Sequence, residues 1–117
     1  MIKYERTVKS MEDIQSDLDI LTDIIPKTVP TEKIILFGSF TRGEQHEDSD
    51  IDVYVVLKDE INMRPLDAMD EMRYALGRKI SMPMDLAAGL KSRFDERKVL
   101  PTLERVINTE GIVLYGN

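Results

Sequence analysis

The alternation in residues 50–57, "DIDVYVVL", constrains the fold of this chain more than any other feature. In a β-strand, residues two apart point to the same face of the sheet. One face of this stretch carries only apolar side chains: Ile51, Val53, Val55 and Leu57. Burial of that face fixes the register of the strand. Asp50 and Asp52 must then project together from the opposite face, at the start of the strand.

Two neighbouring carboxylates repel each other, and each raises the pKa of the other unless a cation joins them. Mg²⁺ is a natural partner, because it binds one or two protein carboxylates together with substrate phosphates. An isolated Asp-x-Asp pair also fits a polar strand end in solvent. The residues upstream of the pair therefore decide between a metal site and a solvated strand end.

Upstream of the acids, "KIILF" (33–37) predicts a short buried strand that ends in a Gly38-Ser39 turn, after which "SFTR" can begin a short helix. The N–H groups at a helix start can hold phosphate, and Gly38 lets a ligand approach the backbone. Ser39 can hydrogen-bond a phosphate oxygen. Arg42, one turn further on, can reach a phosphate or pair with a local acid. Together with the paired acids, this turn predicts a site for a metal-bound nucleoside triphosphate.

A third carboxylate is expected if two metal ions act together, because the ion that activates the nucleophile needs a further ligand. The stretch "MPMDLAA" (82–88) is a third strand candidate, and Pro83 favours a strand start or a sheet edge. Asp85 points away from the apolar face of this stretch. A lone Asp is costly to bury unpaired, so Asp85 indicates either a third ligand or an exposed strand edge.

The rest of the chain alternates helices and strands, which predicts a small α/β domain. A helix is expected over about 10–25, with Ser10 and Asp13 as a capping box and Pro26 and Pro30 ending it. A second helix begins at Pro65, a last one ends near Gly111, and "IVLY" follows as an extended piece. The expected apolar stripes are Met11, Ile14, Leu18, Leu21 and Ile25; Leu66, Met69, Met72, Leu76 and Ile80; and Val99, Leu103, Val106 and Ile107.

Composition excludes several classes of function. The 117 residues suit one domain, expected over 1–117 with a catalytic core over about 31–115. A net charge of −6 argues against general nucleic-acid binding. The chain has no cysteine, so disulfides and Cys-bound zinc are excluded. No membrane-length apolar run exists, and "MIKYERTVKS" lacks the apolar core of a signal peptide, which favours a cytoplasmic protein.

The stretch "GSFTRG" followed by "SDIDVYVV" resembles the signature of the DNA polymerase β-type nucleotidyltransferase superfamily, in which ten residues separate Gly-Ser from Asp-x-Asp. "PMDLAA" is similar to the strand that carries the third acid of this superfamily. The small size and "NTEGIVLYG" resemble the minimal nucleotidyltransferase (MNT) subfamily. The resemblance implies a polymerase β-like fold, with a small mixed β-sheet that is flanked by helices and bears the three acids on one face.

The resemblance further implies transfer of AMP from ATP to a hydroxyl group. Two Mg²⁺ ions are implied, with these ligands: Asp50, Asp52 and Asp85. Asp85 would complete the ion that binds the acceptor and help to deprotonate its hydroxyl. Gly38 and Ser39 would hold the β- and γ-phosphates, and Arg42 would make a phosphate or structural contact.

Minimal nucleotidyltransferases are often paired with a small helical HEPN protein, in pairs that resemble toxin–antitoxin modules. The resemblance therefore implies a HEPN-type partner and a role as antitoxin, by adenylylation, by covering the toxin, or both. Three hypotheses stay open: an antitoxin enzyme, a binding module that neutralises its partner without chemistry, and a small-molecule transferase resembling aminoglycoside-modifying enzymes. A chain this short has little room for an acceptor pocket, so a protein acceptor or a homo-oligomer is expected.

Overall fold

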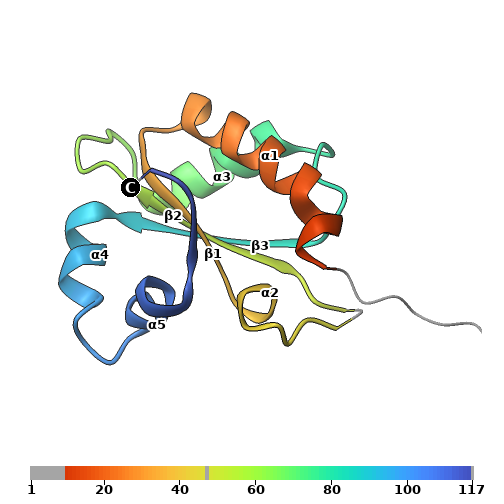
Figure 1. Cartoon of the computed structure of the whole chain (residues 1–117). Coiled ribbons are helices and arrows are strands. Elements are labelled where there is room, and N and C mark those ends of the chain that lie inside the picture. Colours follow the sequence, from red (N-terminus) through yellow and green to blue (C-terminus); the bar gives the residue numbers. More distant parts are fainter. Residues whose placement is uncertain (1–9, 47, 117) are drawn as a thin grey trace, which may run out of the picture.

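The computed structural model describes residues 10–46 and 48–116 (Figure 1). The expected single domain, 1–117, thus includes termini that lie outside the described residues. The helices are α1 (Met11–Thr28), α2 (Ser39–Arg42), α3 (Pro65–Leu76), α4 (Lys91–Arg97) and α5 (Leu103–Glu110). The strands are β1 (Thr31–Phe37), β2 (Ile51–Leu57), β3 (Met84–Leu90) and β4 (Ile112–Tyr115).

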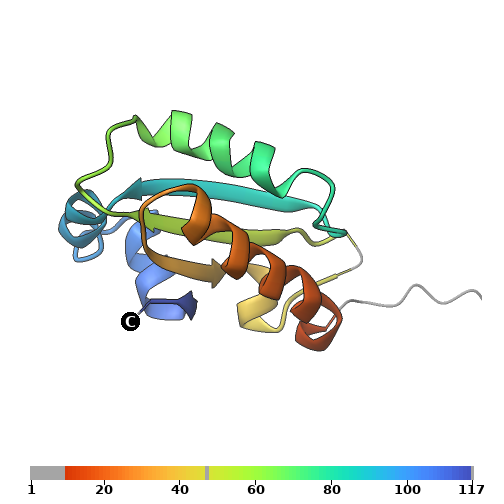
Figure 2. The same ribbon diagram turned by 90° about the horizontal axis from the view of Figure 1, so that it is seen from above.

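One four-stranded sheet, in the order β3-β2-β1-β4, organises the molecule. β1 pairs antiparallel with β2 and β4, whereas β2 and β3 run parallel. Helices α1 and α3 cover one face of the sheet, and α4 and α5 lie on the other (Figures 1 and 2). The predicted α/β fold with a mixed sheet is therefore confirmed. None of the helices in the described ranges is long and apolar enough to cross a membrane.

Helix α1 begins as predicted, with Ser10 as its N-cap and a complete capping box with Asp13. The predicted stripe faces the core: Ile14, Leu18, Leu21 and Ile25 are buried, and Met11 packs against them. The predicted end of the helix is wrong, since Pro26 lies inside the last turn. Pro26 removes only one N–H, and the N–H of Val29 still bonds to the Ile25 carbonyl at 3.1 Å, so the helix continues to Thr28.

Helix α3 begins at Pro65 as predicted, but its buried stripe differs from the expected one. Leu66 is 67% exposed, and the buried side chains are Ala68, Met72 and Leu76, which are spaced four residues apart. Ile80 falls beyond the end of the helix, where it is partly buried.

The segment after β3 forms two helices, and the predicted apolar stripe of a last helix is wrong. Of its four residues only Ile107 is buried; Val99, Leu103 and Val106 are exposed. Thr102 breaks the segment, because its hydroxyl donates to the Arg97 carbonyl at 2.7 Å and its side chain caps α5. Gly111 ends α5, and "IVLY" forms β4, both as predicted.

Candidate active site

Asp52 and Asp85 lie together at one edge of the sheet. β1 ends where β2 begins, so Phe37 pairs with Asp52. β3 starts beside β2, and Asp52 pairs in register with Asp85. Paired residues of neighbouring strands project to the same face. The predicted convergence of the second and third acids on one face is therefore present in the strand register. Asp50 directly precedes β2 and is exposed.

The Gly38 turn lies directly against the Asp52 carboxylate. Gly38 has φ +82° and ψ −153°, a backbone conformation that other residues rarely adopt. A Cβ at this position would overlap with Asp52 Oδ2. Only glycine therefore allows the backbone of the turn to approach the acid this closely.

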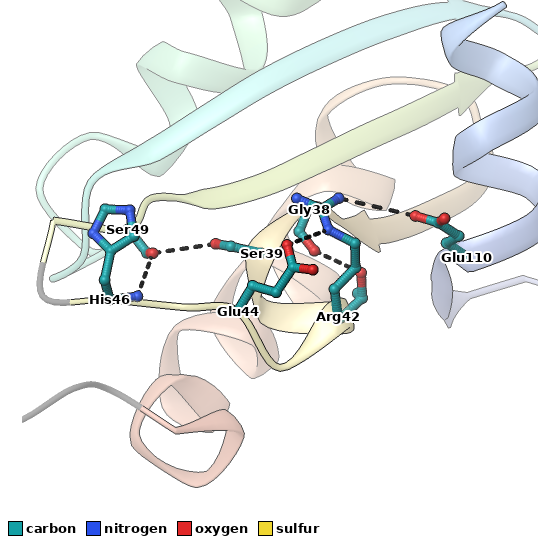
Figure 3. Close-up of polar contacts among 8 residues, drawn as sticks. Gly38, Ser39, Arg42, Glu44, His46, Ser49 and Glu110 are labelled. Atoms are coloured by element: carbon teal, nitrogen blue, oxygen red, sulfur yellow. Dashed lines mark hydrogen bonds and ion pairs between the residues drawn. The ribbon is translucent and has the colours of Figure 1, made fainter.

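Ser39 links the turn to the loop that carries the acids (Figure 3). Its hydroxyl donates to Ser49 Oγ at 3.2 Å, and Ser49 Oγ also accepts from the backbone N–H of His46 at 2.8 Å. Ser49 is buried and directly precedes Asp50. The Ser39–Ser49 contact therefore fixes the loop that delivers Asp50 and Asp52. Sequence reasoning missed Ser49, because no local pattern indicates that a loop serine ten residues from Ser39 is its partner.

Arg42 pairs with acids, which is one of the two alternatives that the sequence left open. Its Nε donates to Glu44 Oε2 at 2.9 Å, and its Nη1 lies 3.9 Å from Glu110 Oε2 (Figure 3). The hydrogen bond to Glu44 raises the pKa of Arg42 above its ordinary value. Through Glu110 this arginine connects α2 with the end of α5. No local pattern in the sequence indicates that contact, because Arg42 and Glu110 are 68 positions apart.

Burial and neighbouring carboxylates raise the pKa of Asp52 above its ordinary value. Burial has the largest effect, followed by the charges of Asp85 and Asp50, while Arg42 lowers the pKa. Asp52 is thus a partly buried anion beside two other acids. The charge of Arg42 lowers the pKa of Asp52 by less than burial and the two acids raise it. This electrostatic environment favours a positively charged ligand at the site.

The raised pKa makes a prediction about stability in the absence of metal. Between the unfolded pKa of Asp52 and its higher folded pKa, the folded state binds more protons, so stability falls as pH rises through that window. The variant Asp52→Asn has no titrating carboxyl at this position, so this fall in stability should be absent from it. We expect urea denaturation in the presence of EDTA to show similar stability for both proteins below about pH 3.9, the ordinary pKa of an unfolded Asp side chain. A deficit of the wild type should then open as pH rises. A pH-independent difference would contradict the assignment.

The carboxylate oxygens at this end of the sheet suit Mg²⁺, but the three acids are not arranged to hold a metal ion by themselves. In residues 10–46 and 48–116, no group of three or more His, Cys, Asp or Glu side chains is arranged so that it could hold a metal ion. Mg²⁺ needs only one or two protein carboxylates when phosphate oxygens and water complete its shell. Asp52 and Asp85 offer such a pair. The site therefore fits an ion that enters with a nucleotide, and a site of three carboxylates stays a prediction.

A Gly-Ser turn beside paired acids on a mixed sheet defines a nucleotidyltransferase-like protein. The chain belongs to the family described as "Polymerase beta, Nucleotidyltransferase", whose profile matches residues 19–117. The family expected from "GSFTRG" and "SDIDVYVV" is therefore confirmed.

Comparison with individual proteins agrees with this family. The chain is 31% identical over 99 residues to the protein adenylyltransferase MntA of Shewanella oneidensis. This match covers 85% of the chain but 62% of the relative, so the chain spans less than two thirds of the relative's length.

Two solved structures share the fold. One is a toxin–antitoxin with AMP-PNP, at a TM-score of 0.58 and 25% identity, covering 86% of this chain and 74% of that chain. The other is a mutant of the toxin–antitoxin MntA-HpeT, at a TM-score of 0.60 and 22% identity, covering 86% of this chain and 73% of that chain.

Proposed function

We propose that this chain is an antitoxin that transfers AMP from ATP to a hydroxyl group of a protein partner. The observation that carries the proposal is the contact between the Gly38 turn and Asp52, which is itself the register partner of Asp85. The Gly-Ser turn and a pair of acids thus meet at one end of strands β2 and β3. The names of the relatives, a protein adenylyltransferase and a toxin–antitoxin with AMP-PNP, support the same reaction.

Gly38 and Ser39 would hold the β- and γ-phosphates of ATP. The Gly38 turn lies against the Asp52 carboxylate, so phosphates held by the turn would lie beside the acid that would bind their Mg²⁺. The Ser39 hydroxyl can turn from Ser49 to donate to a phosphate oxygen. We assign Arg42 a structural role, because its guanidinium already holds Glu44 and lies near Glu110. Its charge would still favour an anionic ligand nearby.

In the proposed reaction, the acceptor oxygen forms a bond to the α-phosphorus of ATP. The bond from that phosphorus to the bridging oxygen breaks, and pyrophosphate leaves. Asp85, whose side chain is exposed at the sheet edge, would accept the proton of the acceptor hydroxyl on a carboxylate oxygen. Two Mg²⁺ ions bound with ATP would stabilise the charge that develops on the phosphoryl group. Their protein ligands would be Asp50, Asp52 and Asp85.

We propose a HEPN-type toxin in the cytoplasm as the acceptor. The toxin–antitoxin structures among the relatives support a protein partner. The C-terminal part of the chain also exposes large apolar side chains, which a protein partner would cover. They are Val99, Leu100, Leu103, Val106, Ile112, Val113 and Tyr115. Neutralisation by contact alone, a small-molecule acceptor and self-association remain the alternatives.

Calorimetry tests the nucleotide site. We expect ATP to bind more tightly with Mg²⁺ than without it, because the cation offsets the repulsion between the acids and the phosphates. Asp52→Asn should remove most of this dependence on Mg²⁺. The matched control Asp70→Asn removes the same charge from an exposed position on α3 and should bind like the wild type. Equal ATP affinity with and without Mg²⁺ would contradict the proposed site.

A further inference from the structure

Asp17 is a buried acid that the proposed reaction does not use. It lies on α1, among the apolar residues of the main core, and is 3% exposed. Its Oδ1 accepts from the Ser81 N–H at 2.9 Å, and its Oδ2 accepts from the Met82 N–H at 3.0 Å. The Ser81 hydroxyl lies 3.1 and 3.0 Å from the two oxygens. The carboxylate thus binds a single short segment that is 64 residues away in sequence.

Burial of a carboxylate is costly unless donors satisfy it. Here two backbone N–H groups and one hydroxyl do so, and hydrogen bonds to a charged acceptor are stronger than neutral ones. An Asn at this position offers one carbonyl oxygen and two N–H donors. In the same side-chain position, one of the two backbone N–H groups would then face the amide NH₂ group in place of an oxygen. The site is built for a charged, two-oxygen acceptor.

The segment that Asp17 contacts leads directly into the pairing of β2 with β3. Directly after Met82, the Pro83 carbonyl accepts from the Ile51 N–H at 2.9 Å. Ile51 then pairs with Met84, and the next register pair is Asp52 with Asp85. The hydrogen bonds of residues 81–83 to Asp17 and Ile51 thus lie immediately before the two acids in β2 and β3. A slip of β3 by one residue would turn Asp85 to the core face.

We propose that Asp17 is a positioning residue, which fixes the register in which Asp85 faces Asp52. This inference rests on the proposed function only in its effect on catalysis. Its structural part concerns the β2–β3 ladder alone. Asp17 touches neither of these acids and would act through residues 81–83.

Amide hydrogen exchange tests the structural part without any activity. In Asp17→Asn, we expect exchange at the start of β3, residues 84–86, to rise by about tenfold or more, as local opening becomes easier. Exchange in the β1–β4 ladder should stay near the wild-type rate. Asp19→Asn changes an exposed acid on the same helix, whose carboxylate accepts from Gln15 at 2.8 Å, and should change neither. Unchanged exchange at 84–86, or a uniform rise through the sheet, would overturn the inference.

Kinetics test the catalytic part. We expect Asp17→Asn to lower kcat about 10–100-fold, since small misplacements of reacting groups have effects of this size. The KM for ATP should change little, because the Gly38 turn lies on another element. Ile25→Val, which trims the same core from the same helix, should lower Tm and keep kcat. If Asp17→Asn does not fold, Ser81→Ala removes only the hydroxyl and should show the same changes to a smaller degree.

The two failures are distinguishable. An inactive wild type would defeat the proposed function, while the exchange result would still decide the role of Asp17. An active wild type with an equally active, folded Asp17→Asn variant would overturn the positioning role alone.

Discussion

The double variant Asp50→Asn/Asp52→Asn is expected to lose AMP transfer by on the order of 10³-fold and to stay folded. The loss follows because the carboxylates that would hold Mg²⁺ against the reacting phosphate become neutral amides. The fold should survive because the apolar face of β2 is unchanged, with Ile51, Val53 and Val55 fully buried. Stability should hold or rise slightly, since Asp52 is a partly buried anion beside other acids. Transfer of radiolabelled AMP and urea denaturation measure the two effects.

The same variant separates chemistry from masking in cells. An antitoxin that works by adenylylation should no longer protect against its toxin when both acids are changed. One that works by covering the toxin should still bind and still protect. Asp70→Asn is the matched control, because it removes a carboxylate from a side chain on α3 that is 79% exposed. Full protection by a folded double variant would defeat the enzymatic proposal.

Gly38→Ala is expected to disrupt the site and the local fold together. Its φ of +82° and ψ of −153° are strained for any residue with a side chain, which should reduce the free energy of unfolding by about 1–3 kcal/mol. The added Cβ would also overlap with the Asp52 carboxylate. Movement of that carboxylate is the easiest relief, and it displaces the acid that the reaction needs. We therefore expect transfer to fall at least about 100-fold.

Gly43→Ala is the control that separates strain from displacement. Gly43 also has a positive φ, +68°, but a Cβ there would meet no atom of residues 10–46 and 48–116 within 4 Å apart from its chain neighbours. Substitution should therefore reduce stability by about 1 kcal/mol and leave transfer nearly unchanged. Thermal denaturation and single-turnover transfer assays compare the two variants. Wild-type transfer by Gly38→Ala would show that the turn does not need to lie against Asp52.

The sheet and its acids could be predicted because their signals are local. The period-two alternation after Asp50 defines the core face of β2, and Gly38-Ser39 marks the end of β1. The same alternation places Asp85 opposite the apolar face of β3, as the register with Asp52 confirms. These features depend on neighbours within a few residues, which is the range that sequence patterns report.

The helix stripes were less predictable because tertiary packing decides which face is buried. Leu66 and Val99 fit an apolar period but point to solvent, while Ala68 is buried. The period gives the spacing of a stripe, but not which of two neighbouring faces the sheet covers. Pro26 likewise lies inside α1, because one lost N–H near a helix end is tolerated.

Side chains that support the site were missed because their partners are distant in sequence. Asp17 contacts Ser81, and Arg42 approaches Glu110, in each case across more than 60 positions. No pattern in a single sequence links such pairs. They become visible only when the fold brings the elements together.

The intact mass of the partner protein tests the central claim most directly. A protein partner captured with this chain would be incubated with the chain, ATP and Mg²⁺, and its mass would be measured. We predict an increase by one or more AMP units, which requires Mg²⁺ and disappears with Asp50→Asn/Asp52→Asn. An unchanged mass of a toxin that the chain nevertheless neutralises would contradict the account and favour inhibition by binding alone.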